Sequence, residues 1–275
     1  MNSPTIRSAA EAICSADALL IGAGAGMGVD SGLPDFRGDE GFWKAYPPLK
    51  NLGISFYQMA DPIWFHRDPR QAWGFYGHRL NLYRVTKPHD GFPHLKRMSQ
   101  ACRLGCFVFT SNVDGHFHFS GFDSDRIVEC HGSIHHLQCS TPCCDEIWAA
   151  DDVNVNVDES TFLAEPPLPS CPQCGSVARP NILMFGDANW LPDRTSRQQQ
   201  SYSRWQSLLD SDVRLVGIEI GAGTAVPTVR YELERQTRGR SSMLIRINPQ
   251  ESSLADGISI GMGGAAAIKA ILDCL

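Results

Sequence analysis

The sequence lacks a long hydrophobic run, an excess of basic residues, and a basic N-terminal segment followed by an apolar one. No apolar run approaches the roughly 20 residues that a membrane-spanning helix needs, so we expect no membrane association. The 24 lysines and arginines are outnumbered by 30 aspartates and glutamates, and the net charge of −6 argues against nucleic acid as a partner. Because no signal-peptide pattern is evident, we expect a cytoplasmic protein.

The composition is that of an ordinary globular protein. With 275 residues, 43% of them hydrophobic and 20% charged, the chain is long enough for one or two domains with a substantial core. Ten cysteines are many for a reducing compartment. In the absence of a secretory signal, closely spaced cysteines indicate metal ligands rather than disulfides.

Apolar segments alternate with helical patterns along most of the chain. We expect strands at 18–21, 106–110, 213–220 and 243–247, helices at 3–16, 69–83, 93–104 and 264–275, and loops at 38–48 and 151–170. Strands separated by helices predict an α/β protein whose Rossmann-like parallel sheet carries helices on both faces.

A cysteine-rich segment, residues 134–178, interrupts this alternation. It predicts a small zinc-binding module, with residues 1–133 and 179–275 forming the Rossmann-like domain. A helical insertion around 38–90 is a further candidate part of the module.

Two cysteine pairs bracket this segment. They are Cys139-x3-Cys143 and Cys171-x2-Cys174, and two such pairs can present four thiolates to zinc in a tetrahedron. Cys144 competes with Cys143 as the fourth ligand, and we favour Cys143. The alternative is a group of buried thiols without metal.

A glycine-dense turn follows the first expected strand, from Gly24 to Gly28, and leads to Pro34-Asp35-Phe36-Arg37. Glycines let backbone N–H groups approach a phosphate, although no complete G-x-G-x-x-G is present. The block resembles the first nucleotide-binding motif of the sirtuins, NAD-consuming protein deacylases, with Leu33 in place of isoleucine. The resemblance implies that NAD contacts Gly24, Ala25, Gly26, Asp35, Phe36 and Arg37.

Polar residues follow the expected strand at 106–110, at the strand end where parallel sheets bind ligands. By its residues alone, Ser111-Asn112-Val113-Asp114 is also compatible with a plain polar turn. It resembles the sirtuin TQNID motif, with Ser111 in place of glutamine. The resemblance assigns Asn112 to the ribose or a nearby water, and Asp114 to the nicotinamide carboxamide. Ser111 then lies beside the cofactor.

His131 is one of nine histidines, and its position rather than its type singles it out. His131-Gly132 lies between the Asn/Asp motif and the cysteine pairs, where it resembles the sirtuin HG motif. This implies that His131 is the general base, a role that suits an imidazole because it titrates near neutrality.

Further segments carry the resemblance, which extends from about Ile21 to Gly264. Residues 179–187 are similar to the sirtuin segment that pairs with the substrate peptide, with Asp187 in place of glutamate. The resemblance implies that the substrate contacts Phe185 and Gly186. It also implies further cofactor contacts from Gly221, Ala222, Gly223, Asn248, Met262 and Gly263.

Tyr76 and Arg79 share one face of the expected helix at 69–83, because they are three residues apart. Sirtuins that remove succinyl and malonyl groups carry a similar Tyr-x-x-Arg pair, which binds the acyl carboxylate. A surface arginine beside a packed tyrosine is an equally weighted interpretation.

The resemblance therefore implies an NAD-dependent protein-lysine deacylase with a structural zinc, acting on acylated protein or peptide. Its products would be nicotinamide, free lysine and O-acyl-ADP-ribose. Two alternatives stay open at this point. One is ADP-ribosyl transfer or NAD hydrolysis, and the other is a noncatalytic NAD or ADP-ribose sensor.

Overall fold

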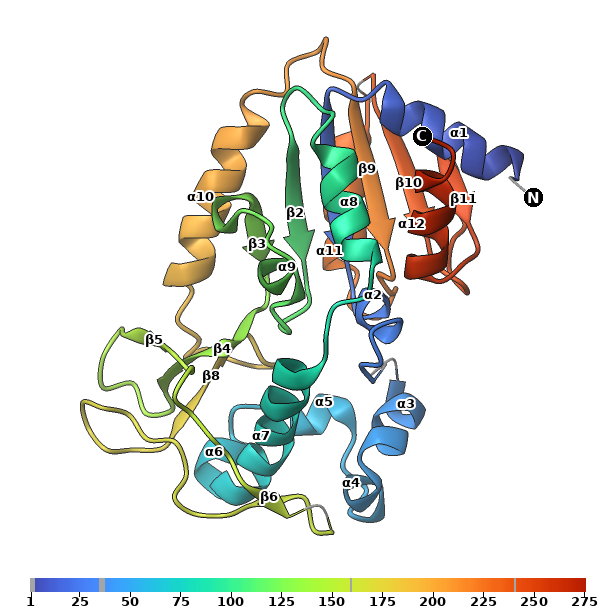
Figure 1. The fold of residues 1–275 in the computed structure, drawn as a ribbon. Helices are drawn as coiled ribbons and strands as arrows, with labels where there is room; N and C mark the ends of the chain where they lie inside the picture. The colour runs from blue at the N-terminus through green and yellow to red at the C-terminus, as the bar shows by residue number, and fades with distance from the viewer. Residues whose placement is uncertain (1–2, 35–37, 159, 240) are drawn as a thin grey trace.

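The computed structural model describes residues 3–34, 38–158, 160–239 and 241–275. A six-stranded parallel sheet, in the order β11-β10-β9-β1-β2-β3, forms the upper part of the molecule in Figure 1. Its strands are β1 (Ala18–Ala23), β2 (Cys106–Thr110), β3 (Ile127–Glu129), β9 (Leu215–Ile220), β10 (Met243–Ile247) and β11 (Ile258–Ile260).

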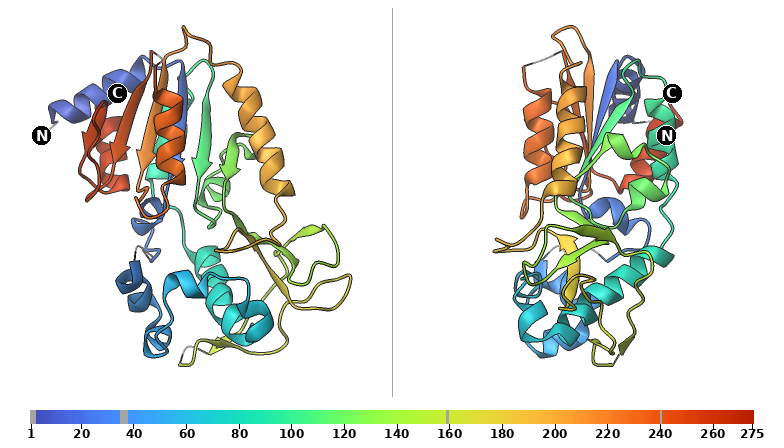
Figure 2. Two further views of the ribbon diagram at one scale, coloured as in Figure 1. Left: turned by 180° about the vertical axis from the view of Figure 1, so that it is seen from behind. Right: turned by 90° about the vertical axis from the view of Figure 1, so that its left-hand side faces the viewer.

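Helices cover both faces of this sheet (Figure 2). One face carries α1 (Pro4–Cys14), α8 (Gly91–Ser99) and α12 (Gly264–Leu272), and the other carries α10 (Asp193–Gln206) and α11 (Thr228–Thr237). Successive residues of β1 supply both cores, since Leu19 and Ile21 face the first set of helices and Leu20 faces the second. The sheet is therefore buried on both sides, as the sequence predicts.

A second, mainly helical part lies beyond the carboxyl ends of the strands (Figure 1). Its helices are α3 (Gly38–Ala45), α4 (Pro47–Asn51), α5 (Phe56–Met59), α6 (Trp64–Arg67) and α7 (Pro69–Val85). Beside them lie a three-stranded antiparallel sheet, β5-β4-β8, and the hairpin β6-β7. These strands are β4 (Gly132–Cys139), β5 (Ile147–Ala149), β6 (Val157–Asp158), β7 (Leu163–Ala164) and β8 (Ala178–Ile182).

The structure corrects two of the expected elements. Residues 38–48 are not a loop, because they form α3 and the start of α4. Phe42, Tyr46 and Leu49 recur at helical spacing and are fully buried, a pattern that the prolines at 47 and 48 obscure in the sequence. The helix expected at 93–104 is α8, which begins at Gly91 and already ends at Ser99.

The cysteine-rich segment begins and ends in neighbouring strands of the small sheet. β4 pairs with β8 in antiparallel register, from Gly132 opposite Ile182 to Cys139 opposite Ala178. The small sheet therefore includes residues on both sides of the expected segment 134–178.

None of the helices in the described part of the chain combines the length and the apolar character that crossing a bilayer requires.

Candidate functional site

A cavity of about 840 Å³ lies where the parallel strands end and the second part of the molecule begins. It is lined from β1 and β9 by glycine-rich loops, from β2 by residues 111–114, from α7 by aromatic and basic side chains, and from β8 by residues 182–187. Its size is in the range of small-molecule sites.

Two glycine loops form one wall of the cavity. Gly221 has a φ of +61°, and a Cβ on it would lie 2.5 Å from the Gly26 backbone. A Cβ on Gly24 would lie 2.6 Å from the Ala222 Cα, so both positions require glycine. Within the described residues, no acceptor is paired with the backbone N–H groups of Ala25, Ala222 and Gly223, which suits a phosphate.

Two side chains that do not line the cavity, Asn248 and Arg230, hold the loop after β9 in place. Asn248 is fully buried, and its amide donates to the Ala222 carbonyl at 3.0 Å. Arg230 donates to the same oxygen from Nε at 3.1 Å and from Nη2 at 2.8 Å. Asn248 therefore positions the loop and does not line the cavity.

The polar residues after β2 face the cavity in fixed positions. Asn112 donates from Nδ2 to the Gly24 carbonyl at 3.0 Å, which joins this segment to the first glycine loop. Asp114 is 7% exposed, and its Oδ1 accepts the His116 N–H at 2.9 Å. Burial raises the pKa of the Asp114 carboxyl, against the opposing effect of His116.

His131 lines the cavity at the start of β4. Its backbone carbonyl accepts the Leu183 N–H at 3.0 Å, so the histidine is fixed to the strand opposite. Burial lowers the pKa of the imidazole, and the Ser111 backbone partly counteracts this. The neutral, proton-accepting form is therefore favoured at pH 7.

Tyr76 and Arg79 both line the cavity from α7, as the helical spacing predicts. Arg79 is 7% exposed, with its guanidinium carbon 5.8 Å from the centre of the Tyr76 ring and its Nε donating to the Tyr83 hydroxyl at 3.0 Å. Burial raises the pKa of the Tyr76 and Tyr83 hydroxyls, so both are neutral donors. Helix α7 thus contributes three side chains with hydrogen-bond donors to the cavity wall.

A buried ion pair supports the residues that line the opposite wall. Arg179 donates to both carboxylate oxygens of Asp187, at 2.7 and 2.8 Å, and neither side chain is more than 1% exposed. Asp187 also accepts the Met184 N–H at 3.3 Å. This pairing closes the turn that contains Phe185 and Gly186, both of which line the cavity.

We expect Asp187→Ala to lower the free energy of unfolding by about 3–5 kcal/mol, because it leaves the Arg179 guanidinium buried and unpaired. Urea denaturation followed by circular dichroism measures the change. The control is Asp273→Ala, which breaks an exposed pair with Lys269 and should cost less than about 1 kcal/mol. Equal effects of the two substitutions would contradict the importance of the buried pair.

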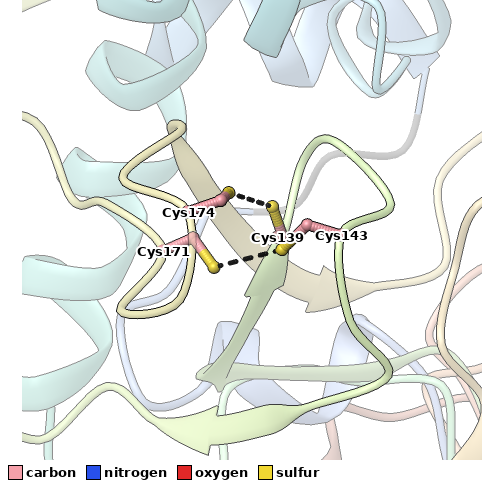
Figure 3. A group of neighbouring side chains, drawn as sticks. All are labelled: Cys139, Cys143, Cys171 and Cys174. Carbon is pink, nitrogen blue, oxygen red and sulfur yellow. Dashed lines mark hydrogen bonds between the residues drawn. The ribbon is translucent and has the colours of Figure 1, made fainter.

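The four predicted metal ligands gather at one end of the small sheet (Figure 3). Their sulfur atoms all lie within 4.8 Å of one another, and the pairs Cys139–Cys174 and Cys143–Cys171 are each separated by 3.6 Å. Tetrahedral zinc with Zn–S bonds of about 2.3 Å requires sulfur atoms roughly 3.8 Å apart, so the cluster fits this ion. Cys144 is not one of the four, although its sulfur lies 3.5 Å from that of Cys143.

The remaining predicted residues lie elsewhere. Gly26 packs behind Gly221 and donates its N–H to the Gly221 carbonyl. Met262 and Gly263 do not line the cavity, and Gly263 lies beside the Asp30 carboxylate. The predicted contacts Asp35, Phe36 and Arg37 lie outside the described residues.

Sequence analysis missed several residues that line the cavity. Tyr83 is the most informative, because it is four residues after Arg79 and seven after Tyr76 on the same helix. The spacing rule that pairs Tyr76 with Arg79 would also have found it. Tyr57 and Val226 line the cavity too, and nothing in the sequence marks them.

The chain matches one protein family and several curated relatives. The model of the Sir2 family matches residues 24–209. The chain is similar to NAD-dependent protein deacylase 1 of Archaeoglobus fulgidus, with 30% identity over 88% of this chain and 86% of the relative. It is also similar to the NAD-dependent protein deacylase of Aeropyrum pernix, with 31% identity over 82% of this chain and 79% of the relative.

Solved structures share the fold. A crystal structure of a Sir2 homolog–NAD complex has a TM-score of 0.71 and 22% identity, and covers 97% of this chain and 92% of the other. A mutant Sir2 homologue in complex with ADP-ribose has a TM-score of 0.71 and 22% identity, and covers 97% of this chain and 95% of the other.

Proposed function

Because the chain belongs to the Sir2 family, we propose that it is an NAD-dependent protein-lysine deacylase that releases nicotinamide and O-acyl-ADP-ribose. The observation that carries this proposal is one cavity that brings His131, Asn112 and Asp114 to the glycine loops. A histidine base, polar groups for a ribose and an amide, and a phosphate cradle are the groups that such a reaction needs.

The residues of the cavity fit NAD. The loops at Gly24–Ala25 and Gly221–Gly223 would hold its phosphates, while Asn112 and Asp114 would orient the nicotinamide riboside. When bound, NAD supplies a ribose carbon that reacts with the acyl oxygen as nicotinamide leaves. Ser111 also lines the cavity, with a side chain too short for the contacts of a glutamine.

His131 acts as the general base. Its neutral imidazole accepts the proton of a ribose hydroxyl, which becomes the nucleophile toward the acyl carbon. Asp114 lines the same cavity, and His135 donates from Nε2 to the Asp114 backbone carbonyl oxygen at 2.8 Å. Rigid placement of this segment keeps the reacting groups aligned.

The zinc is structural in this proposal. Four thiolates leave no coordination position for a reactant, so the ion joins the β4 end to the loop at 171–174. A reducing compartment keeps the four ligand cysteines reduced and able to bind zinc, so we place the protein in the cytoplasm.

Mass spectrometry of products tests the proposal directly. The protein is incubated with NAD and acetylated, succinylated or unmodified lysine peptides. O-acyl-ADP-ribose formed only with an acylated peptide supports the deacylase. If nicotinamide and free ADP-ribose form to the same extent with the unmodified peptide as with the acylated peptides, the result would instead support NAD hydrolysis, the alternative that Ser111 favours.

The donors that α7 contributes to the cavity favour an acidic acyl group. We expect Arg79→Met to lower kcat/KM for a succinylated peptide about 100-fold, because a guanidinium-to-carboxylate bond is lost. The same variant should lose less than about threefold on an acetylated peptide, which serves as the internal control. A parallel loss on both peptides would contradict a role for Arg79 in acyl recognition.

A further inference from the structure

A second cavity, of about 480 Å³, lies on the other side of the catalytic segment. It is enclosed by α9 (His116–Phe119), the 3-10 turn η1 (Ser124–Arg126), the start of β4 and the first turns of α10. In Figure 1 these elements surround the region between β3 and β4 at the left of the molecule. The proposed function uses none of its side chains as a catalytic group.

Helix α10 contributes hydrogen-bond donors to the wall of this cavity. Arg194 binds Glu129 through Nη2, while its Nη1 is buried and has no partner in the described part of the chain. Gln198 uses its carbonyl oxygen for the Glu129 N–H at 3.1 Å, which leaves its amide nitrogen as a donor. Arg197 adds an exposed guanidinium with no ion pair among the described residues.

Two carboxylates lie at or near the cavity, and only the exposed one is unpaired among the described residues. Glu129 is buried beneath the cavity and pairs with both Arg194 and His118. Although its burial opposes ionisation, these two partners hold the pKa of Glu129 below its ordinary value. Asp125 lines the rim and is exposed. The buried part of the cavity therefore has an unused donor and no unused carboxylate.

The cavity also has an apolar side. Phe119 lines it and is 54% exposed, with its ring centre 5.1 Å from that of His135 in an edge-to-face arrangement. His136 lines the cavity as well, and burial lowers the pKa of its imidazole to about 4, so the ring is neutral at pH 7. An occupant with a flat apolar body would cover these rings.

We propose that this cavity is a binding site for a small organic anion, whose carboxylate or phosphoryl group pairs with Arg194 and Arg197 and whose apolar body lies against Phe119. Guanidinium groups recognise both kinds of oxyanion. The occupant would touch His135, whose imidazole also holds the Asp114 carbonyl. The site is thus separate from the proposed NAD cavity. One side chain, His135, links the two, because it would contact the occupant and also holds the segment that carries Asp114.

Fluorine NMR titration tests this site without any catalytic turnover. The probes are 4-fluorobenzoate and 4-fluorophenyl phosphate, with 4-fluorobenzyl alcohol as the uncharged analogue. We expect saturable binding of at least one anionic probe and none of the alcohol. The stronger of the two anions identifies whether a carboxylate or a phosphoryl group is preferred.

Two exposed residues of opposite charge locate the binding. Arg197→Gln should weaken the binding about tenfold, and Asp125→Asn should strengthen it about threefold, because each changes one charge at the cavity. Arg103→Gln, an exposed arginine outside the cavity, is the matched control and should have no effect.

The proposal is overturned if neither anion binds, or if binding is unchanged in Arg197→Gln. It is also overturned if binding is lost in Asn112→Ala and retained in Arg197→Gln, since the probe would then lie in the NAD cavity. Because no arm depends on deacylation, a failure here is distinct from a failure of the proposed function.

Discussion

His131→Ala is expected to lower kcat/KM for deacylation by about 10²–10⁴-fold, the usual contribution of a general base. The imidazole lines the cavity at the point where β4 begins, and alanine leaves no proton acceptor in its place. Affinity for ADP-ribose should change less than about threefold, because the glycine loops are untouched. Steady-state kinetics and isothermal titration calorimetry measure the two quantities.

The pH profile gives this prediction a second readout. Burial lowers the pKa of His131, so the base-competent neutral form persists to lower pH than for a free imidazole. The midpoint of the acidic limb of the kcat/KM profile should therefore lie at a lower pH than the ordinary histidine pKa of about 6.5. This acidic limb should be absent from the pH profile of any activity that His131→Ala retains.

His94 provides the matched control, since it lies on α8 and does not line the cavity. His94→Ala should keep kcat/KM within about twofold of the unmodified protein. A His131→Ala variant with full activity, or one whose ADP-ribose affinity falls in parallel with its rate, would contradict the assignment of a base.

Loss of zinc is the second large effect that we expect. Cys171→Ser should abolish binding of the single equivalent of zinc and lower deacylation at least 100-fold, because an S₄ site contributes its binding free energy to folding. β4 connects the two sites, with Cys139 at its last position and His131 directly before its first. Disorder at the sulfur cluster should therefore reach the catalytic histidine.

Zinc content by inductively coupled plasma mass spectrometry, thermal unfolding and activity are measured on the same samples. Cys144→Ser is the control, because Cys144 is adjacent to a ligand but outside the cluster. It should retain zinc, melting temperature and activity, whereas Cys143→Ser should lose all three. Loss of zinc in Cys144→Ser with retention in Cys143→Ser would exchange the two assignments.

Much of the fold could be predicted because the buried strands have a strong local signal. The strands expected at 106–110 and 243–247 coincide with β2 and β10, since each is a short apolar run bounded by polar residues or glycine. β3 and β11 are three residues long, too short for a period-two pattern to be recognised. The helical region at 38–51 was missed because prolines usually end a helix, whereas here they begin one.

The site was predictable where chemistry is concentrated in a motif. Asn112 and Asp114 come from the segment after β2 and His131 from the segment after β3, and the adjacency of these two strands brings them together. Asn248 shows the limit of this approach. The sequence places it beside a strand end, but only the packing shows that its amide donates a hydrogen bond to the Ala222 carbonyl. The same holds for Val226, whose presence in the wall depends on how the loop after β9 folds.

The position of β1 has a consequence for how the chain folds during synthesis. β1 lies between β2 and β9, and its ladder with β9 joins Ala18 to Leu215, almost 200 residues apart. This ladder cannot form until β9 has left the ribosome. The segment that carries the cysteines is therefore synthesised before β1 can pair with β9. Contacts of such long sequence separation form slowly. Metal capture at residues 139–174 shortens the loop that must close, so zinc supply would govern the yield of folded protein as well as its stability.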